Sequence, residues 1–269
     1  MAKAVKRKED NRYLALIERI FFDRYLPGVE TFEFERTALE KAAKSLKIVL
    51  PKNLGDVIYS IRYRMELPKK IRATQPAGKE WIIEGSGRSK YTFRLSRVVR
   101  FSPNSSLTVI KIPDATPEII GAYALSDEQA LLAKLRYNRL IDIFLGIAAY
   151  SLQNHLRTTA GQIGQVEIDE VYVGIDKAGR QYIVPVQAKG GSDKLSAVQT
   201  KQDIAVCKEK FDNLVCRPVS AQFMAGNLIA LFELKIVDGD VRIAEEKHYE
   251  LVPAKNIGAS DLAAYRNSR

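Results

Sequence analysis

Three residues near the middle of the chain combine a carboxylate, an amide and an amine at a spacing that suits metal-dependent chemistry. Asp169 stands midway along a β-patterned run, and Gln187 and Lys189 end the next run. Side chains two positions apart in a strand share a face, so Glu167 points the same way as Asp169. Carboxylate and amide oxygens can hold a divalent ion that activates water at a phosphodiester.

The segment 165–191 must form a hairpin for these groups to meet. Its apolar positions are rich in Val and Ile, which suit a packed sheet, and the stretch 176–179 (DKAG) has turn-forming composition. A hairpin that pivots there would bring Asp169 close to Gln187 and Lys189. Lys189 could then orient the attacking water or stabilise charge in the transition state. A plain hairpin with surface charges is the alternative interpretation.

This segment resembles the PD-(D/E)xK nuclease superfamily, the restriction-endonuclease-like fold, in its Gln-x-Lys variant. The resemblance covers residues 126–252 and implies an α/β fold, a central mixed β-sheet flanked by helices, with Mg²⁺-dependent cleavage of DNA. It assigns Asp169 to holding the metal, Gln187 to ligating or positioning it, and Lys189 to assisting the water. Two departures are that no proline precedes Asp169 and that Gln187 replaces an acid. Glu167 could supply a replacement ligand.

Composition narrows the remaining function classes. The chain has 269 residues, 46% of them hydrophobic, enough for a full core in one large or two smaller domains. No run approaches a transmembrane span and the basic start lacks an apolar region, so we expect a soluble, cytoplasmic protein. Cys207 and Cys216 are expected as small core residues, and the two histidines, His155 and His248, give little material for a metal site or triad. No Walker-type loop indicates a nucleotide cofactor.

Positive charge is concentrated in the N-terminal part. The net charge is +10, but residues 1–110 hold 23 Lys and Arg against 12 Asp and Glu, whereas the rest holds 19 against 20. A basic domain attached to a near-neutral one suggests that the first attracts phosphate and the second performs chemistry. A merely basic, soluble surface is the alternative.

The first 110 residues follow the order helix, strand, helix, helix and hairpin. Apolar spacing predicts helices over 11–26, 36–46 and 53–65 and strands over 31–34, 80–83 and 91–95. This order looks like a winged helix-turn-helix domain, which implies a third helix in the major groove and a hairpin on the backbone or minor groove. Protein docking is another use of such domains. The residues expected on DNA are Arg62, Arg64, Arg88 and Lys90.

The expected organisation is a DNA-binding domain over 1–110, a linker over 111–125 and a nuclease domain over 126–269. A capping box at 126–129 predicts a helix that runs to about residue 156 and could offer a further acid, Glu128 or Asp142. A helix over 193–211 carries Gln199 as another site candidate. Strands over 215–223, 228–237 and 241–248 complete the sheet, with a hairpin turn at Asp238 and Gly239.

The sequence therefore predicts a Mg²⁺-dependent, restriction-type endodeoxyribonuclease that acts sequence-specifically on double-stranded DNA. A single core cuts one strand, so a double-strand break requires a homodimer or two sequential events. One alternative is a non-catalytic DNA-binding regulator in which the C-terminal domain retains a decayed site. Another is a repair or RNA-directed nuclease.

Overall fold

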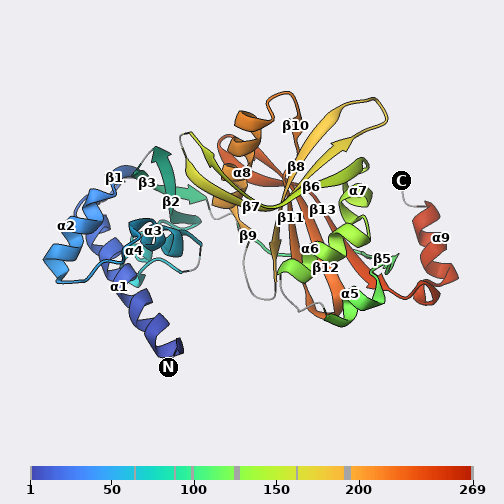
Figure 1. Cartoon of the computed structure of the whole chain (residues 1–269), viewed down its shortest axis with the longest axis horizontal. Helices are drawn as coiled ribbons and strands as arrows, with labels where there is room; N and C mark the ends of the chain where they lie inside the picture. Colours follow the sequence, from blue (N-terminus) through green and yellow to red (C-terminus); the bar gives the residue numbers. More distant parts are fainter. Residues whose placement is uncertain are drawn as a thin grey trace. The chain divides into compact units, whose positions relative to one another are not determined.

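The computed structural model describes residues 2–63, 65–87, 89–97, 100–123, 128–161, 163–190 and 195–267. The chain divides into two compact units, one formed by residues 1–99 with 159–164 and the other by residues 100–158 with 165–269 (Figure 1). Within the described ranges, no helix is both long enough and apolar enough to cross a membrane.

The first unit combines helices with an antiparallel sheet ordered β1-β3-β2. Its elements are α1 (Ala2–Phe22), β1 (Thr31–Glu35), α2 (Thr37–Leu46), α3 (Leu54–Tyr63), α4 (Lys69–Arg72), β2 (Lys79–Gly87) and β3 (Lys90–Arg97). The expected helices and strands are all present, and α4 is an added turn of helix. The β2–β3 strands are longer than expected at both ends.

An aromatic cluster holds the first unit together. The ring of Phe21 on α1 meets Trp81 and Phe93 edge to face, each with centroids 5.2 Å apart, and stacks on Tyr25 at 4.9 Å. Phe21 and Phe93 are fully buried. Such contacts add to the hydrophobic burial of large rings, so α1 is fastened to the sheet through its last turn.

The second unit is built on a large mixed sheet ordered β5-β13-β12-β11-β8-β7-β6. The strands are β5 (Val109–Pro113), β6 (Ala148–Ala160), β7 (Gly164–Ile175), β8 (Gln181–Lys189), β11 (Val219–Phe223), β12 (Leu228–Val237) and β13 (Asp240–Val252), with short β10 (Val215–Cys216) beside β8. β11 runs parallel to β8 and β5 parallel to β13, whereas β7–β8, β11–β12 and β12–β13 are antiparallel. A two-stranded ladder joins β4 (Arg100–Phe101) to β9 (Leu195–Ser196). The fold class, mixed α/β with a central mixed sheet flanked by helices, is confirmed.

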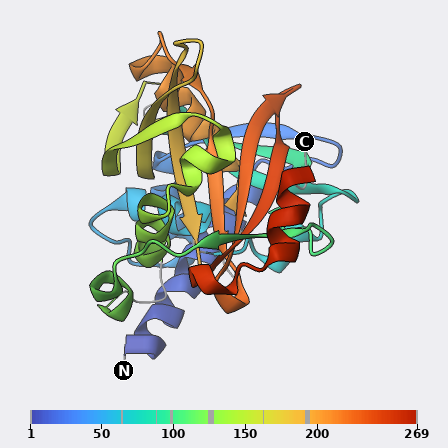
Figure 2. The same cartoon turned by 90° about the vertical axis from the view of Figure 1, so that its right-hand side faces the viewer.

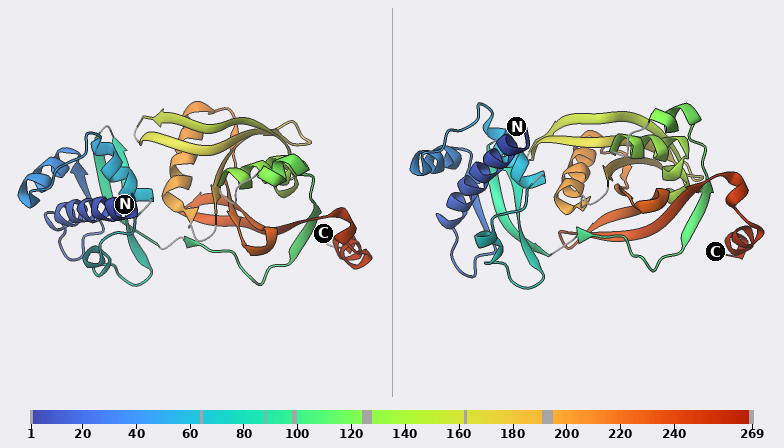
Figure 3. Two further views of the ribbon diagram at one scale, coloured as in Figure 1. Left: turned by 60° about the horizontal axis from the view of Figure 1, so that its bottom comes forward. Right: turned by 90° about the horizontal axis from the view of Figure 1, so that it is seen from below.

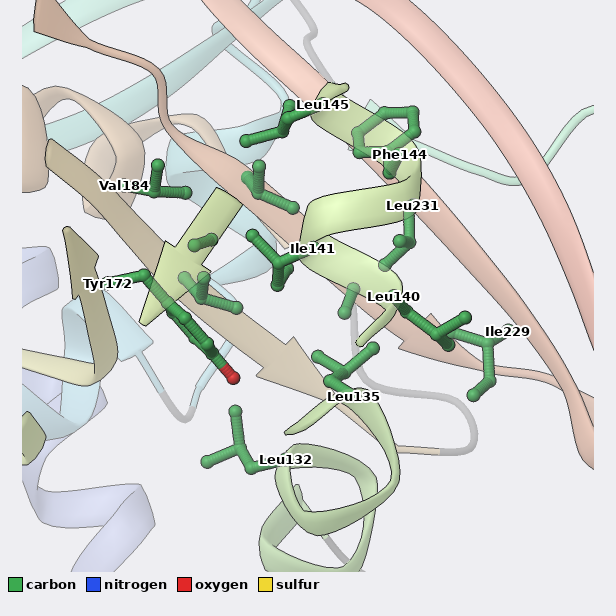
Figure 4. Packing of buried hydrophobic residues seen from close by; sticks show 14 of the residues in the cluster. Leu132, Leu135, Leu140, Ile141, Phe144, Leu145, Tyr172, Val184, Ile229 and Leu231 are labelled. Carbon is green, nitrogen blue, oxygen red and sulfur yellow. The ribbon is translucent and has the colours of Figure 1, made fainter. Parts of the chain in front are cut away.

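Helices cover both faces of the sheet at β8. On one face lie α6 (Glu128–Tyr137) and α7 (Leu140–Leu145), whose Leu135, Leu140 and Ile141 are buried with Val184 and Leu231 of the sheet (Figure 4). On the other face lies α8 (Ala197–Lys210), between the β6–β7 hairpin and the β12–β13 pair (Figure 3). Successive side chains of β8 therefore face α6 and α7 on one side of the sheet and α8 on the other.

The helix expected to continue to residue 156 is wrong in its second half. Arg139 and Gly146 adopt left-handed conformations, with φ of 51° and 64°, and these bound the short helix α7. The chain then extends as β6, where Leu152 is 51% exposed. Apolar residues recur every four positions at Phe144, Ala148, Leu152 and Leu156, which is typical of a helix, but all of them except Phe144 lie in strand β6.

The segment expected as a linker contributes regular structure. β5 pairs with β13, and α5 (Glu118–Tyr123) follows it. The C-terminal helix α9 (Ala259–Asn267) lies beside β5 (Figure 2), where the Lys111 backbone N–H donates to Tyr265 Oη at 2.9 Å and Lys111 Nζ pairs with Asp261 at 3.1 Å. Thus 109–113 belongs to the second unit, in which β5 is the edge strand of the sheet beside β13.

Candidate active site

The strands β7 and β8 stop pairing where the expected site residues begin. Their ladder runs from Ile175 opposite Gln181 to Glu170 opposite Val186. At the next position the Asp169 carboxylate, through Oδ2, accepts a hydrogen bond from the Ala188 backbone N–H at 2.8 Å. This side-chain hydrogen bond follows the last backbone pair of the ladder and holds the Asp169 carboxylate at the end of β8.

The pleat of β8 places Gln187 and Lys189 on the face that α8 covers. Val184, Val186 and Ala188 belong to the core beneath α6 and α7. Successive side chains of a strand point to opposite faces, so Gln187 and Lys189 face the other way. Gln187 is buried, with 3% of its surface exposed, and Lys189 is half-buried. The structure therefore brings Asp169 and the Gln-x-Lys pair to one end of two adjacent strands.

A fourth residue, Asp203 on α8, joins this group and was not anticipated. Its Oδ2 accepts a hydrogen bond from Gln187 Nε2 at 2.9 Å, and only 2% of its surface is exposed. Burial raises the pKa of Asp203 well above its usual range, the Gln187 hydrogen bond opposes that rise, the charge of Asp169 adds to it, and the charge of Lys189 opposes it. Asp203 thus lies within electrostatic reach of both other ionisable site residues.

Helical spacing in the sequence could have pointed to Asp203 as a site residue. Gln199, the residue selected from this helix, lies one turn before Asp203 on the same face. Asp203 is followed by buried Ile204, Val206 and Cys207, and an acid inside such an apolar stretch is seldom buried without a partner. Its partner, Gln187, comes from a different element, and only the fold connects the two.

Glu167 lies next to the group, but its carboxylate is directed toward β6. Glu167 Oε1 is 3.3 Å from Arg157 Nη2 and 3.6 Å from His155 Nδ1. Its backbone carbonyl accepts a long hydrogen bond of 3.4 Å from Gln187 Nε2. His155, expected near a helix end, stands in strand β6 with φ of 48°. In this arrangement Glu167 contributes its backbone, not its side chain, to the surroundings of Gln187.

The other acids considered for the site have different partners. Asp142 accepts hydrogen bonds from the Ala149 N–H at 3.0 Å and from the Arg139 guanidinium. It lies in α7, on the opposite side of the sheet from α8. The side chain of Glu128 lies outside the described residues. Glu170, which was not among those acids, is fully buried on that same α6 face and accepts hydrogen bonds from Arg136 Nε at 2.9 Å and Ser151 Oγ at 2.5 Å.

The residues expected on DNA fall in the first unit. Arg62 is in the last turn of α3 and is half-buried, with its Nε and Nη2 atoms shielded from solvent. Lys90 is exposed at the start of β3. Arg64 and Arg88 lie outside the described residues. Lys90 is therefore the accessible cation of this set for which the structure gives a position.

The oxygen atoms of the group suit a hard divalent cation. Asp169 and Asp203 supply carboxylates and Gln187 supplies an amide, the ligand types that Mg²⁺ accepts. Within the described residues, Gln187 Oε1 and Asp203 Oδ1 are buried without a hydrogen-bond partner, which is unusual for polar atoms. The same residues contain no cluster of three or more His, Cys, Asp or Glu side chains placed to hold a metal. The Asp169 carboxylate and the unpaired amide oxygen of Gln187 therefore fit Mg²⁺, with Asp203 bonded to the same amide.

Comparisons with known proteins add no relative to this description, since no protein-family model, no curated protein and no solved structure matches the chain.

Proposed function

We propose that the protein is a Mg²⁺-dependent endodeoxyribonuclease of the restriction type, acting on double-stranded DNA. The observation that carries the proposal is the grouping of Asp169, Gln187 and Lys189 at the end of β7 and β8, with Asp203 bonded to Gln187. A carboxylate, a second oxygen ligand and an amine are the groups that hydrolysis of a charged phosphodiester requires.

The order of elements around the group supports the same proposal. Helices α6 and α7 and then strand β6 precede the antiparallel β7–β8 pair, α8 follows, and β11 then returns parallel to β8. A right-handed crossover through a helix is the usual connection between parallel neighbours. Apart from the added edge strand β6, this is the helix, strand-pair, helix, strand order that the resemblance to PD-(D/E)xK nucleases implies, with Asp169 on the earlier strand and Gln187 and Lys189 on the later one.

Each residue has a separate role in this proposal. Asp169 and Gln187 hold Mg²⁺, which when bound supplies Lewis-acid polarisation of the scissile phosphate. Asp169 is kept in place by the Ala188 N–H. Lys189 orients the attacking water or balances the negative charge that develops in the transition state. Burial by α8 keeps the group partly free of bulk water, which strengthens these electrostatic interactions.

The first unit supports DNA as the substrate. Its order of helices and strands, with the sheet β1-β3-β2, is similar to a winged helix-turn-helix domain. Residues 1–110 carry the excess of Lys and Arg, and Lys90 is exposed on the hairpin. In this proposal α3 approaches the major groove and the β2–β3 hairpin contacts the phosphate backbone.

The test is cleavage of unmethylated and methylated plasmid DNA with Mg²⁺ by the intact chain, Asp169→Ala and Lys189→Ala. Lys177→Ala, which changes an exposed lysine in the β7–β8 turn, is the matched control. Discrete fragments that require metal, persist in the control and vanish in both site variants are expected. Tight DNA binding without cutting under any divalent ion would instead favour the non-catalytic regulator.

The same digestion shows whether a homodimer is needed to cut both strands. If a homodimer performs the double-strand cut, linear product should appear directly and its rate should rise steeply with protein concentration. If a single core cuts each strand in turn, nicked circles should accumulate first. Gel filtration with and without DNA would identify the species responsible.

A further inference from the structure

Asp203 is a buried acid whose hydrogen-bond donor is an uncharged group. It is 2% exposed, and its hydrogen bond comes from the uncharged amide of Gln187. Its other oxygen, Oδ1, is buried and has no hydrogen-bond partner within the described residues. Burying a carboxylate in this way opposes folding, and an apolar side chain would fill the position without that cost. The acid at this position therefore calls for an explanation outside stability.

The hydrogen bonds around Gln187 decide which way its amide points. A carboxamide has one acceptor oxygen and one nitrogen with two donor hydrogens. Gln187 Nε2 lies 2.9 Å from Asp203 Oδ2 and 3.4 Å from the carbonyl oxygen of Glu167, and both of these atoms are acceptors. Rotating the amide by 180° would set its oxygen against two acceptors, so the network selects one orientation.

That orientation leaves the amide oxygen available. Gln187 Oε1 is buried and has no hydrogen-bond partner among the described residues. It belongs to the residue next to Ala188, whose N–H holds the Asp169 carboxylate. An unused amide oxygen and an anchored carboxylate at the same end of two adjacent strands are suited to a divalent cation. A reversed amide would present N–H hydrogens, which repel a cation.

We propose that Asp203 is a positioning residue that orients the amide of Gln187 so that its oxygen, not its nitrogen, is presented to a divalent cation held by Asp169. This inference rests on the proposed function. In it, Asp203 acts through Gln187 and does not ligate the cation itself. Groups that orient metal ligands in this way commonly change metal affinity about 10–100-fold when they are removed.

The central test is a double-mutant cycle in which metal affinity is measured without DNA, by calorimetric titration of the intact chain with Mg²⁺ alone. Asp203→Leu removes the acceptor that orients the amide, and we expect it to weaken Mg²⁺ binding about 10–100-fold. In a Gln187→Glu background the side chain has two equivalent oxygens and needs no orientation. There, adding Asp203→Leu should weaken Mg²⁺ binding far less than it does in the parent chain.

Two further variants control for disturbance of α8. Asp203→Asn retains an acceptor oxygen and is expected to keep Mg²⁺ affinity within a few-fold of the parent chain. Thr200→Val alters another buried side chain of the same helix and should leave Mg²⁺ affinity unchanged. Circular dichroism and the melting temperature show whether each variant is folded, so a loss of binding can be separated from unfolding.

The possible results separate this inference from the proposed function. If the parent chain binds no Mg²⁺ or binds it equally well after Asp169→Ala, the proposed metal site is wrong and the inference falls with it. If the parent binds Mg²⁺ through Asp169 but Asp203→Leu has no effect, only the positioning role is overturned. Equal weakening by Asp203→Leu in both the Gln187 and Gln187→Glu backgrounds also overturns it, because a purely structural role would act regardless of residue 187.

Discussion

At the scale of single residues, two hydrogen bonds made by carboxylate side chains hold the candidate site together. Asp169 closes the β7–β8 ladder by accepting from Ala188, and Asp203 takes a donor from Gln187 across the gap between helix and strand. The second of these bonds leaves the Gln187 amide oxygen without a hydrogen-bond partner among the described residues. In the proposed site, Asp203 adds a second carboxylate from another element beside the glutamine.

Asp176 provides a residue-scale prediction about pH. It accepts hydrogen bonds in the β7–β8 turn from the Ala178 N–H at 2.8 Å, Arg180 Nε at 2.7 Å and Tyr182 Oη at 2.8 Å. Burial opposes ionisation, but the hydrogen bonds from Tyr182, Arg180 and the turn amides outweigh it and lower the pKa of Asp176 below its usual range.

A carboxyl whose pKa falls on folding stabilises the native state above its unfolded pKa, and this contribution is lost as pH falls through the folded pKa. Asp176→Asn should therefore lower the melting temperature by a few degrees at pH 7, and the difference from the parent chain should shrink in acid. Asp212→Asn, at an exposed loop position, is the control and should have little effect. A deficit in Asp176→Asn that stays constant down to acid pH would show that the ionised form is not responsible.

At the scale of elements, sequence patterns predicted the hairpins correctly, because a hairpin depends on residues close together in the chain. Strand alternation and turn chemistry predicted the β7–β8 hairpin, and Asp238 and Gly239 form the expected turn with φ of 53° and 78°. The helix expected beyond Leu145 was wrong, because spacing alone does not reveal the left-handed residues that end α7. Asp203 escaped prediction because its partner is 16 positions away in sequence on another element, so its meaning depends on how α8 packs over β8.

The attachment of α7 to the sheet gives an element-scale prediction. Arg217 forms a two-pronged ion pair with Glu233 of β12, at 2.7 and 2.8 Å, and also donates from Nη1 to the Leu145 carbonyl at the end of α7, at 3.0 Å. Arg217→Ala leaves a partly buried carboxylate and a helix carbonyl without their donor. We expect a loss of about 2 kcal/mol in the free energy of unfolding.

Arg217→Lys is the informative comparison because it preserves charge but not the planar fork, and it should recover only part of the loss. Urea denaturation measures both variants, with an unchanged slope indicating that stability alone has changed. Equal midpoints for Arg217→Ala and the parent chain would mean that these three contacts contribute nothing measurable.

At the scale of the whole molecule, charge is divided between the two units. Residues 1–110 are strongly basic, and the remainder is close to neutral. If the first unit holds DNA through phosphates, affinity should fall steeply with salt, since each contact releases condensed counterions. Lys90→Ala should weaken duplex binding and reduce the slope of log affinity against log salt by about 1, whereas Lys177→Ala should leave it unchanged.

Fluorescence anisotropy of a labelled duplex without divalent cations would measure these slopes. Equal slopes for the parent chain and both lysine variants would remove Lys90 from the DNA-binding surface. Equal losses in Lys90→Ala and Lys177→Ala would indicate that the whole charged surface attracts DNA without a preferred face.

The most direct test of the account is the single-turnover rate of plasmid cleavage with Mg²⁺, measured with DNA fully bound, for the parent chain, Asp169→Asn and Lys189→Ala. Both variants are expected to bind DNA like the parent but to cleave it at least about 100-fold more slowly. Parent-like cleavage by either variant, or fully bound DNA that the parent chain leaves intact in Mg²⁺, would contradict it.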